Sequence, residues 1–241
     1  MDTDLASQLR ASLAHQERLL KTSIILNPVE NVPFAEDLAV VAGPLHGLYN
    51  TDKVRSRDQR SQTPLQFAGR QSIENDARTI YSLWAEALGA ADATLRLLSG
   101  LHAHIVLFMA MAKPGQTVLL LPVEAGGHLS GKAIVERLGL VVTEMVVDND
   151  GMCIDIERTL ALCDHRGPDF VFVDRSEGLV FEDFSPLAAI DGSLAVFDSS
   201  QYLTNNICGD HPNPLEWEFD LMGEHPQELP GTTEGAARHA T

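Results

Sequence analysis

The chain has 241 residues, of which 44% are hydrophobic and 6% aromatic, and this is enough for one large α/β domain with a substantial core. Its formal net charge is −17, from 34 acidic and 17 basic side chains, and such a surface repels nucleic acid and anionic membranes. We therefore expect neither as a partner. Lysine is scarce, and none occurs after Lys132.

Cysteine usage indicates the compartment. The three cysteines, Cys153, Cys163 and Cys208, are widely spaced and form no CxxC pair. This argues against a disulfide framework or a zinc site and fits a reducing cytoplasm. The N-terminal residues MDTDLASQLR are acidic and lack the apolar core of a signal peptide, and no apolar run is long enough to span a bilayer. The sequence therefore predicts a cytoplasmic protein.

Residues 1–64 are predicted to form a helix followed by an arm of loops. Apolar residues recur at helical spacing over 4–20, which predicts an amphipathic helix used for packing or as a dimer arm. Glu30 follows in a proline-flanked loop, where an acid is either solvated or held as a proton carrier. Residues 43–72 are rich in Gly, Pro, Ser and Gln, and their arginines either are solvated or reach a phosphate or carboxylate.

A regular pattern begins at residue 72. A helix is expected over 72–88, where a glycine ends it, and a short strand over 94–98. Ser99 and Gly100 then lead into an apolar helix over 104–112. A strand, a Ser-Gly turn and a helix N-terminus together form a common phosphate-binding device, because the backbone N–H groups and the helix dipole favour an anion.

Strands and helices alternate over the rest of the main domain, which we place at residues 65–231, before a flexible tail at 232–241. This alternation predicts an α/β fold with a mostly parallel sheet and helices on both faces. The expected strands cover 118–122, 140–147, 170–173, 194–197 and 219–222, and the expected helices cover 130–138, 154–162 and 186–190.

Asp198 follows directly after the buried run Leu194–Phe197. An acid at the C-terminal end of a parallel strand lies where α/β folds place their chemistry. The histidines at 102, 104, 128, 211 and 225 form no pair with metal-ligand spacing and a third partner, so we expect no metal site. No serine lies in a G-x-S-x-G turn, which argues against an α/β-hydrolase nucleophile.

In this order, the segments resemble serine hydroxymethyltransferases and the related threonine aldolases and transaldolases, which are pyridoxal-phosphate enzymes of fold type I. The resemblance runs from about residue 19 to residue 231 and implies the three-layer αβα large domain of that fold. It rests on Val29–Asn31, Gln66–Gly69, Leu98–Ala103, Lys113–Val118, Gly126–Leu129, Asp150–Met152 and His211–Pro214.

The resemblance implies a role for each matched residue. Glu30 would be the catalytic acid that shuttles protons, and His128 would stack on the cofactor ring. Asp198 would pair with the pyridine nitrogen and keep the ring protonated as an electron sink. The Ser99-Gly100 turn would bind the phosphate of pyridoxal 5'-phosphate, and Gln201 stands where a histidine of the family contacts the cofactor.

The chain departs from the family pattern at several positions. The lysine that forms the Schiff base is absent: Gln227 stands there when the chain is counted without gaps from its Pro-Asn-Pro segment, and Pro226 with a one-residue slip. Phe67 replaces a tyrosine, and Leu101 and His102 replace phosphate-binding residues. The strand and the small C-terminal domain that follow in the family are expected to be missing, so we expect that the chain does not work alone.

Three functions remain open. The chain is either a hetero-oligomer subunit that completes the active site of a lysine-bearing partner, for pyridoxal-phosphate-dependent aldol-type chemistry on a β-hydroxy-α-amino acid, or a non-catalytic scaffold or regulatory subunit of the same fold. In the first case, Glu30 would handle protons in the partner's site. A third possibility is that Asp198 and His128 bind the cofactor without a covalent bond.

Overall fold

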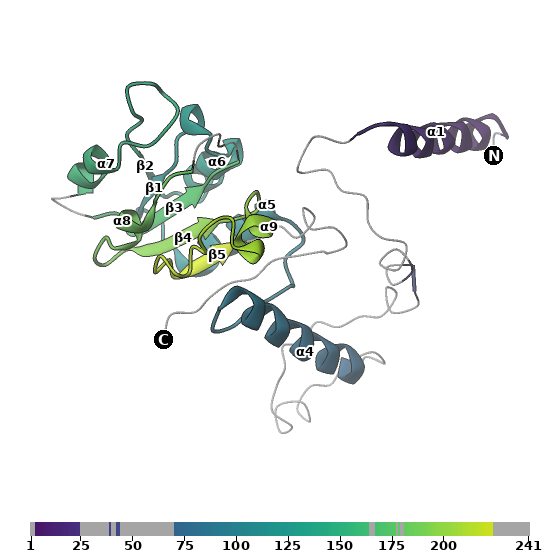
Figure 1. Ribbon diagram of the computed structural model, residues 1–241, viewed down its shortest axis with the longest axis horizontal. Coiled ribbons are helices and arrows are strands. Elements are labelled where there is room, and N and C mark those ends of the chain that lie inside the picture. Colours follow the sequence, from purple (N-terminus) through teal and green to yellow (C-terminus); the bar gives the residue numbers. More distant parts are fainter. Residues whose placement is uncertain are drawn as a thin grey trace.

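The computed structural model describes residues 3–24, 39, 42–43, 70–163, 167–176, 178 and 181–223, in which parallel strands alternate with helices (Figure 1). Glu30, the Gln66–Gly69 segment and Gln227 lie outside the described residues, and the predictions made for them stay predictions. The proposed division at residues 64/65 and 231/232 also stays a prediction.

The centre of the fold is a five-stranded parallel sheet with the strand order β2-β1-β3-β4-β5. Its strands are β1 (Thr117–Leu120), β2 (Val141–Glu144), β3 (Phe170–Asp174), β4 (Leu194–Asp198) and β5 (Leu221–Gly223). All five were predicted, although β1, β2 and β5 are shorter than expected. The register pairs Asp174 with Asp198 at the C-terminal ends of β3 and β4.

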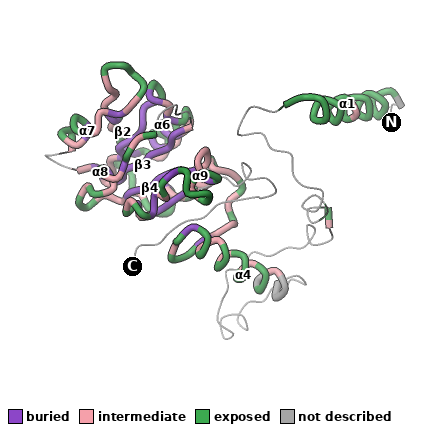
Figure 2. Tube along the Cα trace, viewed as in Figure 1, coloured by how far each residue is buried: buried purple, intermediate pink, exposed green. Residues whose placement is uncertain are grey.

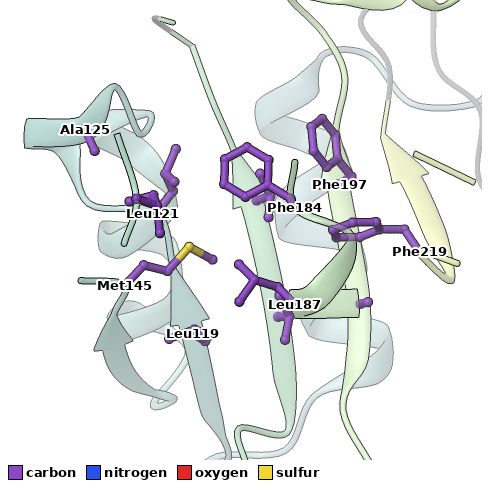
Figure 3. Close-up of a cluster of buried hydrophobic side chains, with 12 residues drawn as sticks. Leu119, Leu121, Ala125, Met145, Phe184, Leu187, Phe197 and Phe219 are labelled. Carbon is purple, nitrogen blue, oxygen red and sulfur yellow. The ribbon is translucent and has the colours of Figure 1, made fainter. Parts of the chain in front are cut away.

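One face of the sheet packs against α7 (Ile156–Cys163) and α8 (Ser185–Ala188). Successive side chains of a strand point to opposite faces of the sheet. Val171 of β3 and Phe197 of β4 both lie on this face. Figure 3 shows Leu187 of α8 among the side chains of this cluster, below Phe184. Leu187 and Val171 are fully buried, and truncating such a side chain typically costs about 2–5 kcal/mol.

The opposite face packs against α5 (Gly100–Met111) and α6 (Leu129–Arg137). Phe108 of α5 meets Phe172 of β3 edge to face, with 5.2 Å between the ring centroids. Val135 supplies the corresponding buried contact from α6. Helices therefore cover both faces of a parallel sheet, which confirms the predicted fold class.

The segment before α5 differs from the prediction. Residues 94–98 form no strand, because the Leu98 N–H donates to His102 Nδ1 at 3.0 Å instead of pairing with a strand. The helix itself begins at Gly100, earlier than predicted, because the Ser99 side chain accepts a hydrogen bond from the His102 N–H and caps it. A short helix, α9 (Leu203–Cys208), was not predicted.

The helices near the N-terminus follow their sequence patterns. α1 (Thr3–Thr22) confirms the predicted amphipathic helix, and Figure 2 shows it exposed along its length. α4 (Arg70–Leu88) ends at Gly89, which adopts a φ of +64° that favours glycine. In the described part of the chain, none of the helices is both long and apolar enough to cross a bilayer.

The last turn of α4 is joined to the C-terminal end of the described fold. Leu88 is buried in a small cluster with Leu203, Leu215 and Met222. The Asn213 side-chain amide donates to the Leu88 carbonyl at 2.7 Å, which satisfies one of the carbonyls left unpaired at the end of the helix.

Candidate functional site

The candidate site lies at the C-terminal ends of the strands. Because β1 has β2 on one side and β3 on the other, the direction of strand addition reverses between β1 and β3. Open α/β sheets bind ligands in the crevice outside such a reversal. A small hollow is found there, lined among others by His128, Gly131, Lys132, Glu144 and Asp174.

Asp198 ends β4 and is the acid that the sequence singled out. It is 5% exposed, and each carboxylate oxygen accepts one hydrogen bond: Oδ2 from His104 Nε2 at 2.5 Å and Oδ1 from the Ser200 N–H at 2.8 Å. Burial favours the neutral acid, but the hydrogen bond and charge of His104 and the hydrogen bonds of Ser200 outweigh it, so the net pKa of Asp198 is lowered. The carboxylate is therefore held ionised, with lone pairs to spare.

His104 is the first residue of the site that the sequence did not reveal. It lies on the buried face of α5, 5% exposed, with its ring edge-on to Phe172. Its Nδ1 atom lies 3.7 Å from Asp174 Oδ2 and makes no hydrogen bond. Burial lowers the pKa of His104, but the hydrogen bond and charge of Asp198 and the charge of Asp174 reverse this, so that the net pKa is raised. His104 therefore lies between two acids that favour its protonated form.

Asp174 is the second such residue, and it ends β3 as Asp198 ends β4. Its Oδ2 atom is buried without a hydrogen-bond partner. Burial and the nearby charge of Asp198, opposed by His104, raise the pKa of Asp174 to about 7. The signal that identified Asp198, an acid directly after a buried strand, is present at Asp174 as well.

His128 is tied to the same strand end. Its backbone N–H donates to the Asp174 carbonyl at 3.1 Å, and its Nδ1 atom accepts from the Ser130 N–H as the N-cap of α6. The side chain is exposed, so one face of the ring is open to a ligand. The preceding Gly127 brings the backbone close, because a Cβ atom there would lie 2.3 Å from the Leu121 carbonyl oxygen.

Ser99 and Gly100 form the N-terminus of α5. Gly100 lies one turn before His104 on the same helix, about 6 Å along the axis at a rise of 1.5 Å per residue. The start of the helix is thus joined to the carboxylates through His104. Gln201 is half-buried in the turn after β4. His104 and Asp174 therefore join the predicted residues Ser99, Gly100, His128 and Asp198 into one region.

The cluster has a simple chemical description. One donor atom each from His104, Asp174 and Asp198 lies within 4.8 Å of the others, a set able to hold a proton or a divalent cation. Their wide separation in the sequence gave no sign of it. Lys132 lines the adjacent hollow, but its Nζ atom donates to Glu144 Oε1 at 2.8 Å.

The fold and sequence are similar to those of known enzymes. The chain is 32% identical over 190 residues to the fluorothreonine transaldolase of Streptantibioticus cattleyicolor, covering 76% of this chain and 29% of that protein. It is 25% identical over 203 residues to the serine hydroxymethyltransferase of Pyrobaculum arsenaticum, covering 82% and 44%, and 29% identical over 154 residues to the α-methylserine aldolase of Variovorax paradoxus, covering 61% and 35%. No protein-family model matches the chain.

Among solved structures, the L-threonine transaldolase of Pseudomonas fluorescens superimposes with a TM-score of 0.83 at 19% sequence identity, over 99% of this chain and 54% of that one. This likeness shows the fold. The chain spans less than half of the length of the three curated relatives named above.

Proposed function

Because this chain is a homologue of the serine hydroxymethyltransferases and threonine transaldolases, we propose that it builds part of a pyridoxal-phosphate site for aldol-type chemistry on a β-hydroxy-α-amino acid. The observation that carries the proposal is Asp198, a buried carboxylate held ionised at the end of β4. An ionised acid in this position supports binding of a protonated ring nitrogen, and its remaining lone pairs leave room for one.

The residues present fit the cofactor. Asp198 would accept a hydrogen bond from the protonated ring nitrogen, and the exposed ring of His128 would lie against the cofactor ring. Ser99, Gly100 and the N-terminus of α5 would receive the phosphate, with Gln201 near the ring edge. When bound, pyridoxal phosphate supplies an electron sink for the charge that develops at the amino-acid Cα atom on cleavage of the Cα–Cβ bond.

Each of the chain's own site residues would then have a separate role. Asp198 would hold the proton on the ring nitrogen, because losing it would leave the buried carboxylate without a cation on that side. His128 would lie against the ring, and the N-terminus of α5 would hold its phosphate. We assign the proton transfer at the substrate hydroxyl to Glu30.

In the proposed site, covalent attachment of the cofactor would fall to a second chain. The sequence contains no lysine after Lys132. The resemblance places Gln227, or Pro226 with a one-residue slip, at the position of the family's lysine. Lys132 is held by Glu144. We therefore propose a cytoplasmic hetero-oligomer in which a lysine-bearing partner supplies the covalent link and this chain supplies Glu30 to the shared site.

One observation favours the second candidate, a non-catalytic subunit of the same fold. Asp198 already has a cation beside it, His104, so its charge is satisfied within the chain. In that case the fold would serve as a scaffold or regulatory surface, and the cofactor would be absent from this chain's site.

Copurification from the native source separates the two candidates. The first predicts a lysine-bearing partner, a visible cofactor absorption band in the complex and aldol-type turnover that the isolated chain lacks. Replacing Glu30 by Gln in the reconstituted complex should lower kcat by about 100-fold, within the usual range for loss of an acid–base residue. An unchanged rate would favour the scaffold, and turnover by the isolated chain would refute the shared site.

A further inference from the structure

We propose that His104 is a positioning residue for Asp198, held in place by Asp174, so that three side chains form the charge chain Asp174–His104–Asp198, whose Asp198 end would meet the ring nitrogen of the proposed cofactor. The inference deepens the proposed function and rests on it for the identity of the ligand. It rests on the described geometry for the roles of His104 and Asp174.

Two hydrogen bonds fix the orientation of the Asp198 carboxylate. His104 Nε2 lies 2.5 Å from Asp198 Oδ2, while the Ser200 N–H holds the other oxygen at 2.8 Å. These two donors come from different elements, α5 and the turn after β4, so the carboxylate plane is fixed from two sides. Phe172 packs edge-on against the imidazole, with 4.9 Å between ring centroids, and prevents it from tilting away.

Charge explains why a second acid is present. Asp198 alone would be neutralised by one cation, but the proposed site brings two: the imidazolium of His104 and the protonated ring nitrogen. Asp174, 3.7 Å from His104 Nδ1, supplies the second negative charge when it is ionised. Two carboxylates and two cations then alternate, and no charge of this buried group is left uncompensated.

The surroundings leave this role to His104. The described groups that face it are Asp198 from β4 and Asp174 from β3, together with the uncharged ring of Phe172. Lys132 reaches the hollow beside Asp174 from α6, but it is paired with Glu144. The imidazole is thus the cation placed between the two acids.

A divalent cation is the competing use of the same atoms. The imidazole presents Nε2 to Asp198 and Nδ1 to Asp174, so its two nitrogens serve different acids. One donor atom of each residue lies close enough for a single ion, but that ion would take only one ring nitrogen and would leave the contact of the other nitrogen unused. The arrangement suits a protonated ring, which donates from both nitrogens.

The first test is NMR of the ¹⁵N-labelled full chain, and it needs no cofactor. At pH 7, we expect both ring nitrogens of His104 to carry protons, with a downfield proton on Nε2. In Asp174→Asn, His104 should lose its proton at a lower pH. A neutral His104 at pH 7, a titration that Asp174→Asn leaves unchanged, or stoichiometric Zn²⁺ binding that Asp174→Asn abolishes would each overturn the proposal.

The second test is calorimetric titration with pyridoxamine phosphate, which needs no lysine. Affinity should fall about tenfold in His104→Leu, equal to about 1.4 kcal/mol, and return in part in His104→Asn, which keeps an N–H donor. Val106→Ala is the control, because Val106 is exposed on the other side of α5. Equal affinity in wild type and His104→Leu would overturn the positioning role. If wild type binds none, the proposed cofactor site fails, while the NMR result still decides the state of His104.

Discussion

Asp174 and Asp198 are register partners at the ends of neighbouring parallel strands, and one histidine faces both of their carboxylates. Side chains of paired residues in a sheet point to the same face, so the two carboxyl groups lie close together. Their pKa values separate as a result: Asp198 gains the hydrogen bond of His104, and Asp174 does not. One acid is thereby held ionised, while the other titrates near neutral pH.

Replacing Asp174 by Asn is expected to stabilise the chain at high pH. The folded-state pKa of Asp174, about 7, lies above its ordinary value of 3.8, so the wild-type chain loses stability as the pH rises between these values. At about 1.4 kcal/mol per pKa unit, the full loss in the free energy of unfolding is about 4 kcal/mol. Because the variant also loses the partner of His104, we expect a net gain of about 1–3 kcal/mol at pH 8 and none at pH 4, measured by urea unfolding.

Asp191→Asn is the control for this experiment, since Asp191 is exposed in a turn. It should leave the pH dependence of the free energy of unfolding unchanged. A gain in Asp174→Asn that is the same at pH 4 and pH 8 would contradict the assigned titration.

Replacing Gly127 by Ala is expected to destabilise the loop that carries His128. The new Cβ atom would lie 2.3 Å from the Leu121 carbonyl oxygen and 2.8 Å from that of Pro122, and both contacts are with backbone that cannot move aside cheaply. We expect a loss of about 3 kcal/mol in the free energy of unfolding, the upper end for overpacking.

Gly131→Ala, four residues later, provides the matched comparison. Its Cβ atom would meet Asp174 Oδ2 at 3.5 Å, an ordinary contact, and it lies in a helix, where alanine is preferred over glycine. Stability should be unchanged or higher by up to about 1 kcal/mol. If both variants unfold at the same urea concentration, the close approach at Gly127 is not real.

Removing one member of the buried pair Arg175–Glu182 should destabilise the fold strongly. The guanidinium also donates to the carbonyls of Ala125 and Met152, at 3.1 and 3.0 Å, and thereby joins three segments. Arg175→Met leaves the buried Glu182 carboxylate without its cation, which typically costs about 3–5 kcal/mol. Thermal and urea unfolding would measure this loss.

The exposed pair Arg158–Asp155 is the control: it also joins an arginine to a carboxylate, and its arginine side chain is 62% exposed. Arg158→Met should change the free energy of unfolding by less than about 1 kcal/mol, as is usual for surface ion pairs. Similar losses for Arg158→Met and Arg175→Met would refute the importance of burial.

Lys132 is not expected to replace the missing lysine. The hydrogen bond and charge of Glu144 raise the pKa of Lys132, which lowers the fraction of free amine able to attack an aldehyde. After incubation with pyridoxal phosphate and reduction with borohydride, mass spectrometry should find Lys132 labelled no more than the exposed Lys113. Preferential labelling of Lys132 would show that this side chain forms the covalent bond.

The sequence predicted the buried strands well and the peripheral elements less well. β3 and β4 match the prediction within one residue, because a continuous apolar run bounded by polar residues is typical of a strand buried on both faces. β2 was predicted too long, because apolar residues continue beyond the point where its pairing with β1 ends. The strand predicted at 94–98 is absent. A strand needs a neighbouring strand to pair with, and no local sequence pattern indicates whether there is one.

The site was predicted in part for a similar reason. Asp198 and His128 were found from local motifs, but His104 acquires its meaning only when α5 packs on the sheet and β3 and β4 align in register. Asp174 carried the same local signal as Asp198 and was passed over because no motif of the resemblance contains it. A search for every acid that ends a buried strand would have found it.

The hydrogen bond from Asn213 to the last turn of α4 spans 125 residues of sequence. On the ribosome, α4 therefore emerges long before the segment that covers Leu88 has been made. A contact with so large a separation forms late, and the apolar end of the helix stays open to other proteins until then. Chaperone contact during synthesis should accordingly concentrate on α4 and end when residues 203–222 leave the exit tunnel.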